Sequence, residues 1–257
     1  MAYELSVNLE YMFTEAGERI EDRIAAAAAA GIRKVELFLL KDRDLPGIAK
    51  ALADNEVELV STVADYVTQL VDPQTHEGFC DTFRQAAQDA RTLGCHNVVV
   101  LSGRGVPWMK RPVQTGIFTD ALRKLLPIAE ELDVTILLES ANARVDHPGV
   151  LASLTQDSAE IADTLDHPRV RLLYDLYHSV VEGEDPAEVL PKVIHLVDHV
   201  QIADAPGRGE PGSGAIDWPA QINLLETVGY KGVIGVECQP TQTSTADAIA
   251  YIQKLCG

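Results

Sequence analysis

The stretch HVQIADAPGRGEPGSGAIDWP, residues 199–219, decides the fold, because a short apolar run leads directly into a glycine-rich loop. Three other short apolar runs also end in a polar side chain. They are VTILLES (134–140), RLLYDLYH (171–178) and GVIGVECQP (232–240). Continuous apolar runs of this kind are typical of strands that are buried on both faces of a parallel sheet. We therefore expect four parallel strands whose ends converge on one site.

Outward from these runs, the whole chain alternates strand-like and helix-like segments. The apolar and β-branched runs predict strands at 5–9, 34–39, 57–63, 97–101, 134–139, 170–175, 196–203 and 232–237. Helix formers, capping residues and terminal glycines predict helices at 17–30, 44–55, 79–93, 114–132, 155–166, 185–195, 217–228 and 244–255.

Strands that alternate with helices pair in parallel through right-handed crossovers. Eight such units predict an α/β fold of the (β/α)8 TIM barrel type, formed as a single domain by residues 1–257. The alternative is a doubly wound open sheet. That fold usually carries a glycine-rich phosphate loop after its first strand, and residues 8–14 contain no glycine.

Composition limits the partners of the protein. The net charge is −18, which argues against binding to nucleic acid or to an anionic membrane surface. No apolar run approaches the ~20 residues of a membrane span, and the start, MAYELSVNLEY, has no apolar signal-peptide core. The four cysteines form no CxxC pair, so we expect a reduced, cytoplasmic protein. A small-molecule substrate is the expected partner, and the sequence is compatible with a homo-oligomer.

The four runs place polar tips at one end of the predicted barrel. Side chains alternate along a strand, so Glu139, Asp175, Gln201 and Glu237 are expected to point inward. Active sites of parallel barrels lie at this carboxyl end of the strands. Any one of these residues could be an ordinary corner residue, but four on successive strands favour a shared site. Their oxygen-only ligands suit Mg²⁺ or Mn²⁺.

Four further residues are candidates for substrate binding. His178 follows Asp175 by three positions and could contact a substrate oxygen. Arg208, in the glycine-rich loop, suits a substrate carboxylate or hydroxyl, and Glu210 could hold it in place. Asn142, just after the 134–139 strand, is assigned to the same group. The alternatives are a histidine packed under a loop and an arginine on the surface.

At these residues the chain resembles the hydroxypyruvate isomerase family, within the xylose-isomerase-like barrels. The resemblance is strongest over residues 172–240 and extends to SVNLEYMFTE (6–15) and LLESAN (137–142). It implies a divalent cation held by the four polar tips, with the two glutamates also acting on the protons of the substrate. A glutamine at position 201 resembles this family, since the ketose 3-epimerases usually have histidine there.

The first half of the chain departs from that resemblance. Family members carry a glycine- and asparagine-rich segment after the third strand, where this chain has STVADYVTQLVDPQTHEGFCD (61–81). The proline-glycine-arginine segment that usually precedes the third helix is also missing. Because these parts line the substrate pocket in that family, the resemblance leaves the identity of the substrate open.

These observations predict a metal-dependent isomerase of a small α-hydroxy carbonyl compound, such as hydroxypyruvate, tartronate semialdehyde or a related 2-oxo sugar acid. Glu139 and Glu237 would be the catalytic groups that move a proton through an enediolate. A ketose 3-epimerase and an inosose-dehydratase-like lyase share the first step and stay open. An endonuclease with a zinc cluster would need more histidine ligands and a basic groove, and a non-catalytic sugar-binding protein would need no complete set of ligands.

Overall fold

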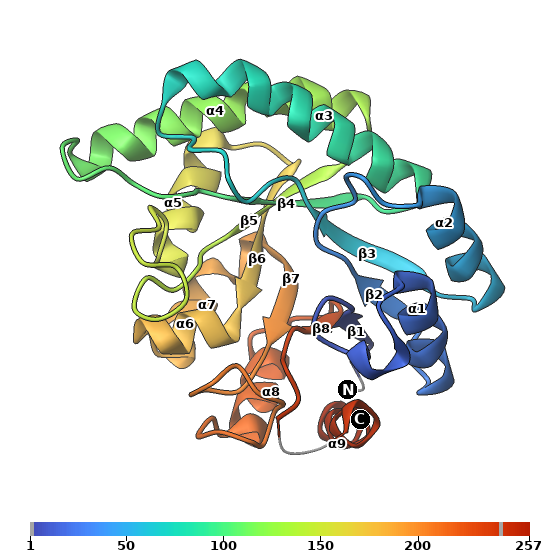
Figure 1. The fold of residues 1–257 in the computed structure, drawn as a ribbon. Coiled ribbons are helices and arrows are strands. Elements are labelled where there is room, and N and C mark those ends of the chain that lie inside the picture. The colour runs from blue at the N-terminus through green and yellow to red at the C-terminus, as the bar shows by residue number, and fades with distance from the viewer. Residues whose placement is uncertain (1–2, 242–243) are drawn as a thin grey trace.

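The computed structural model describes residues 3–241 and 244–257. In these residues eight parallel strands close into one barrel (Figure 1). The strands are β1 (Leu5–Asn8), β2 (Lys34–Glu36), β3 (Glu58–Val63), β4 (Asn97–Leu101), β5 (Thr135–Glu139), β6 (Val170–Asp175), β7 (Val197–Ile202) and β8 (Ile234–Val236). The barrel closes where Ser6 of β1 lies opposite Gly235 of β8. The predicted (β/α)8 TIM barrel is confirmed.

Helices surround the barrel and follow its strands in order (Figure 1). They are α1 (Ile20–Ala29), α2 (Leu45–Asp54), α3 (His76–Thr92), α4 (Arg111–Glu131), α5 (Thr155–Leu165), α6 (Leu176–Glu182), α7 (Pro186–Val193), α8 (Trp218–Thr227) and α9 (Thr245–Cys256). Short 3-10 turns lie at Thr14–Ala16, Pro73–Thr75 and Ile194–Leu196. The two ends of the chain meet where the Tyr3 N–H donates to the Cys256 carbonyl at 2.9 Å.

The sequence analysis did not predict α6, which begins directly at the end of β6. Asp175 is both the last residue of the strand and the N-cap of the helix, because its side chain accepts the His178 N–H at 3.1 Å. The helix ends at Gly183, where φ is 91°. The predicted boundaries of α4 were also wrong: the helix begins at Arg111, since Pro112 fits its first turn.

Side chains alternate along the strands as expected. Val98, Ile136 and Leu138 face outward and join the main core between the barrel and the helices. Inward-facing apolar residues form a separate cluster, which consists of Val63, Val99, Leu137 and Leu173. The inward-facing polar residues come from β1, β2, β3 and β7 and are Ser6, Asn8, Glu36, Ser61, His199 and Gln201. The interior of the barrel is thus apolar on one side and polar on the other.

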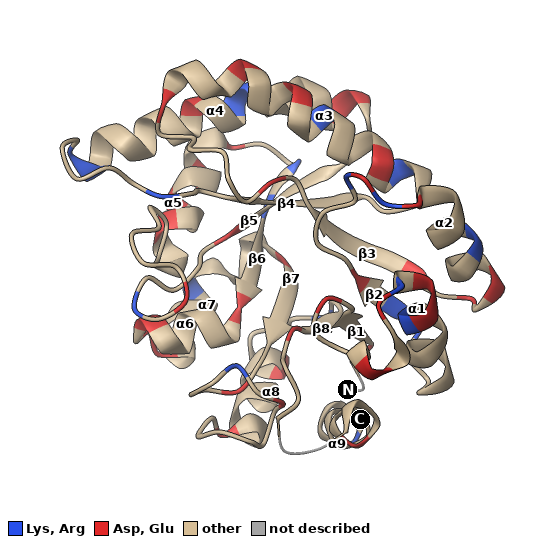
Figure 2. Cartoon of the chain, viewed as in Figure 1, with Lys and Arg blue, Asp and Glu red and all other residues tan. Residues whose placement is uncertain are grey.

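Charged residues are spread over the outer helices and the loops (Figure 2). None of the described helices is both long and apolar enough to cross a bilayer.

Candidate active site

A cavity of about 290 Å³ lies among the carboxyl ends of the strands. Of the residues predicted for the site, Glu139, His178, Gln201, Arg208 and Glu237 line it. Asp175 contacts both His178 and Arg208 at the edge of this cavity. The structure therefore brings the four polar strand tips together with the predicted histidine and arginine.

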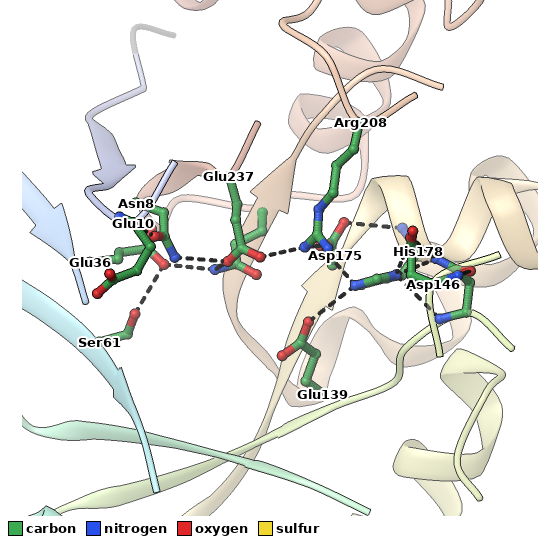
Figure 3. A network of polar contacts seen from close by, with 12 residues as sticks. Asn8, Glu10, Glu36, Ser61, Glu139, Asp146, Asp175, His178, Arg208 and Glu237 are labelled. Carbon is green, nitrogen blue, oxygen red and sulfur yellow. Dashed lines mark hydrogen bonds and ion pairs between the residues drawn. The ribbon is translucent and has the colours of Figure 1, made fainter. Parts of the chain in front are cut away.

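Arg208 links two of the predicted metal ligands (Figure 3). Its Nη2 donates to Glu237 Oε1 and lies 3.6 Å from Asp175 Oδ2. Its guanidinium carbon is 5.5 Å from the centre of the Tyr11 ring and 5.2 Å from that of Tyr177. The arginine is therefore held by two carboxylates and two aromatic faces, and it is not a surface residue.

The residues fit a divalent cation. Glu139, Asp175 and His178 each bring one atom of a ligand type within 4.8 Å of the others. Among the described residues, two buried oxygens beside them, Asp175 Oδ2 and Gln201 Oε1, have no hydrogen-bond partner, although Asp175 Oδ2 lies 3.6 Å from Arg208 Nη2 and 3.7 Å from His178 Nε2. Buried polar atoms are normally paired, so an unpaired carboxylate oxygen and an unpaired amide oxygen point to a hard cation.

His178 is better suited to donate a hydrogen bond to a substrate oxygen than to bind the metal. Its Nδ1 accepts hydrogen bonds from the backbone N–H of Asn142 at 3.2 Å and from the side-chain amide at 2.6 Å. In the neutral ring the proton is then on Nε2, which lies 3.7 Å from Glu139 Oε1 and 3.7 Å from Asp175 Oδ2. Metal-bound histidines instead donate through their second nitrogen. Burial lowers the pKa of His178 to about 4, which keeps the ring neutral.

Glu36, at the end of β2, is a buried carboxylate that the sequence analysis treated as part of an apolar strand. It accepts hydrogen bonds from Ser6 Oγ (2.6 Å), Ser61 Oγ (3.0 Å), His199 Nε2 (3.0 Å) and Gln201 Nε2 (2.8 Å). Burial alone would raise the pKa of Glu36, but the charge of His199 and these hydrogen bonds lower it to about 2. Glu36 is therefore ionised and fixes the orientation of Gln201.

Gln201 connects Glu36 to Glu237, one of the proposed ligands. Its Nε2 donates to Glu36 Oε2 and, at 2.7 Å, to Glu237 Oε2. Asn8 Nδ2 donates to the same oxygen of Glu237 at 3.0 Å. Since both amide protons of Gln201 face carboxylates, its Oε1 is the atom left for a ligand.

The two proposed catalytic glutamates have pKa values above the usual range. Burial, then the negative charges of Glu237 and Asp175, raise the pKa of Glu139 well above its ordinary value. Burial raises the pKa of Glu237 to about 8, although Arg208 acts in the opposite direction. A carboxylate with a raised pKa is a stronger base than an ordinary one, which suits a group that takes up a proton.

The loop after β7 positions Arg208. Asp204, which is fully buried, accepts the N–H groups of Ala205 (2.8 Å), Gly212 (2.7 Å) and Ile216 (3.2 Å) and the indole N–H of Trp218 (2.8 Å). Arg208 itself has a φ of 56° and follows Gly207 at 101°. The glycine-rich sequence is therefore a tight loop around one carboxylate, as expected for a loop beside a ligand.

The other two predicted substrate-binding residues do not line the cavity formed by the described residues. Asn142 lies behind His178, and its amide also donates to Asp146 at 2.7 Å. Glu210 accepts a hydrogen bond from the Thr241 N–H at 2.8 Å. The carboxylates that form ion pairs with Arg208 belong to Asp175 and Glu237. In this structure Asn142 and Glu210 hold neighbouring groups in place.

Comparison with known proteins is consistent with this geometry. Residues 24–255 match the model of the xylose isomerase-like TIM barrel family. The chain belongs to this family. It is 28% identical to hydroxypyruvate isomerase of Escherichia coli, covering 94% of this chain and 95% of that protein. It is also 28% identical to 2-oxo-tetronate isomerase of Pectobacterium atrosepticum, with 97% of each chain covered.

Among solved structures, that of AP endonuclease, family 2, from Brucella melitensis is similar to the present chain. The TM-score is 0.88 at 25% identity, and 98% of each chain is covered. The curated relatives support the prediction that this xylose isomerase-like barrel is an isomerase.

Gly235 of this barrel is expected to tolerate no side chain. A Cβ atom there would lie 2.1 Å from Glu36 Oε1 and 2.9 Å from His199 Nε2. Gly235→Ala should lower the free energy of unfolding by about 1–3 kcal/mol, because it displaces the buried, hydrogen-bonded side chains of Glu36 and His199. Urea unfolding measures this change. Gly78→Ala is the matched control, since no atom lies within 4 Å of its new Cβ; equal destabilisation by both changes would contradict the role of Gly235.

Glu36 is expected to give the stability of the barrel a measurable pH dependence. Its folded-state pKa, about 2, is below the ordinary 4.5. The stability that it contributes is therefore complete above pH 4.5 and is lost as the pH falls toward 2, with a total of about 3 kcal/mol. The difference in unfolding free energy between the wild type and Glu36→Gln should narrow over that range. A difference that is constant with pH would show that Glu36 is not ionised in the fold.

Proposed function

We propose that the protein is a divalent-cation-dependent isomerase of a small α-hydroxy carbonyl compound, of the class of hydroxypyruvate, tartronate semialdehyde or a related 2-oxo sugar acid. The observation that carries this proposal is the set of oxygens around one cavity. Glu139, at the end of β5, and Glu237, directly after β8, line the cavity. Beside them lie one oxygen of Asp175 and one of Gln201 that have no hydrogen-bond partner among the described residues. Isomerisation of such a compound requires a proton to leave one carbon and to return to its neighbour.

We infer that Glu139, Asp175, Gln201 and Glu237 hold the cation, and that it is Mg²⁺ or Mn²⁺, because all four offer oxygen. When bound there, it would polarise the substrate carbonyl and stabilise the negative charge that develops on the enediolate oxygens. Glu139 is the better candidate for the base. Glu237 accepts hydrogen bonds from Asn8, Gln201 and Arg208. Within the described part of the chain, the polar side chain in contact with the Glu139 carboxylate is His178, at 3.7 Å.

His178 and Arg208 would orient the substrate. The Nε2 proton of His178 is directed toward the cavity side of Glu139 and Asp175, where it can reach a substrate oxygen. Among residues 3–241 and 244–257, the buried Nε of Arg208 has no hydrogen-bond partner, so one donor of the guanidinium is unused. A fork of N–H donors suits the carboxylate of an α-keto acid.

Other activities share parts of this apparatus. A ketose 3-epimerase or an inosose-dehydratase-like lyase would begin with the same proton abstraction, so the identity of the product distinguishes them. An endonuclease activity, as the name of the Brucella protein suggests for that protein, is disfavoured by the net charge of −18, because DNA binding depends on basic groups that contact phosphates. We propose a small-molecule substrate instead. The four cysteines are free, which is the usual state in the cytoplasm, so we propose that location for the protein.

Cation binding tests the proposed ligands directly. Calorimetric titration with Mn²⁺ should show one site, and Asp175→Asn should weaken binding at least about tenfold by removing a charged ligand. Asp185→Asn is the matched control: this aspartate is also an N-cap but is exposed on α7, so binding should not change. Crystals soaked in Mn²⁺ that show no density between the four residues would contradict the proposal.

The route of the proton tests the two glutamates. Turnover in D₂O should place deuterium on the product carbon, because an abstracted proton exchanges with solvent, and NMR measures it. Glu139→Gln should stop this exchange while three ligands still bind Mn²⁺. Full retention of the substrate hydrogen over many turnovers would instead indicate a hydride shift, and the roles of both glutamates would then be wrong.

A further inference from the structure

One side of the candidate active-site cavity is apolar. Phe38 follows β2, Val63 ends β3, Tyr66 lies in the next loop, and Val99 and Leu101 belong to β4. All five line the cavity that Glu139, Gln201 and Glu237 also line. We call these five residues the apolar wall. Only Tyr66 among them carries a polar side-chain atom.

The apolar wall is built into the fold. Val63 and Val99 are buried in the inner cluster, and Phe38 and Leu101 pack against it. The rings interlock edge to face, with centroids 5.5 Å apart for Tyr11 and Phe38 and 5.7 Å apart for Phe38 and Tyr66. Aromatic pairs in this arrangement stabilise each other, so the wall is present before a ligand arrives.

The proposed chemistry determines what meets this wall. The carbonyl and hydroxyl oxygens of the substrate must face the carboxylates and the amide oxygen of β5 to β8. The end of the substrate away from the reacting carbons then crosses the cavity toward the apolar wall. Glu36 and Ser61 also line the cavity near this wall, but they are hydrogen-bonded to each other at 3.0 Å, and Ser6, His199 and Gln201 occupy the other positions around Glu36. A hydroxyl group at that end would leave water without gaining a strong partner, whereas a methyl group would gain from burial.

We propose that the apolar wall selects α-hydroxy carbonyl substrates whose far end is deoxygenated, such as a methyl or a longer alkyl group, over substrates with a hydroxyl group there. This inference rests on the proposed isomerase function.

A matched pair of substrates tests it. 2-Oxo-tetronate and its 4-deoxy analogue have the same carboxylate, carbonyl and reacting hydroxyl, and they differ only in a terminal hydroxyl. Deuterium exchange of the reacting C–H in D₂O with Mn²⁺, followed by NMR, gives kcat/KM for each. The wild type should favour the deoxy compound about tenfold or more, as expected for one group in an apolar pocket.

Leu101 supplies the variants for this test. Leu101→Gln adds an amide to the wall at similar size and should reduce the preference about tenfold, while Leu101→Met keeps the wall apolar and should leave the ratio unchanged within about twofold. Val63→Thr, which is nearly equal in shape, replaces Leu101→Gln if that variant does not fold. The ratio of two substrates is insensitive to a general loss of active enzyme.

Each outcome has a distinct meaning. Equal use of the two compounds, or a preference for 2-oxo-tetronate, would overturn the inference and leave the isomerase function in place. A preference for the deoxy compound that persists in Leu101→Gln and Val63→Thr would show that the wall does not cause it. If neither compound exchanges, the proposed function is wrong and the inference falls with it.

Discussion

The carboxylate of Glu36 is the constraint on which the candidate site depends. An ionised group in the interior of a barrel is stable only if its partners replace water, and four side chains do so here. One of them, Gln201, passes the constraint to Glu237 through its second amide proton. The polar half of the interior is therefore one connected network. This network uses both amide protons of Gln201 and leaves its Oε1 without a hydrogen bond among the described residues.

That network explains why the interior of the barrel is divided. Buried carboxylates need donors close by, and β1 and β7 supply them around Glu36 and Glu237. The opposite side has no charge to satisfy and is filled by Val63, Val99 and Leu173. A substrate between the two halves meets carboxylates at one end and hydrocarbon at the other. Chemistry and selectivity can then be assigned to different strands of the same barrel.

The fold was predictable from sequence because its signals are local. Apolar runs, N-caps and terminal glycines mark each strand–helix unit, and alternation within β5 and β6 placed Leu137 and Leu173 inside correctly. Glu36 was missed although it follows an apolar residue at the end of a strand, as Glu139 does. Its decisive partner, His199, is 163 residues away in the chain, so only the closed barrel reveals the pair. The helix α6 was missed because Asp175 both ends a strand and caps a helix.

The position of Arg208 links the two parts of the site. Its guanidinium now compensates the charges of Asp175 and Glu237, which are also proposed cation ligands. In this structure the rings of Tyr11 and Tyr177 lie 5.5 and 5.2 Å from its guanidinium carbon. If a bound cation neutralised the two carboxylates instead, the arginine would keep its aromatic neighbours but its charge would no longer be compensated. Its positive charge would then be available to an anionic substrate. Cation and acidic substrate are therefore expected to bind in a mutually supportive way, because each compensates the charge that the other leaves unpaired.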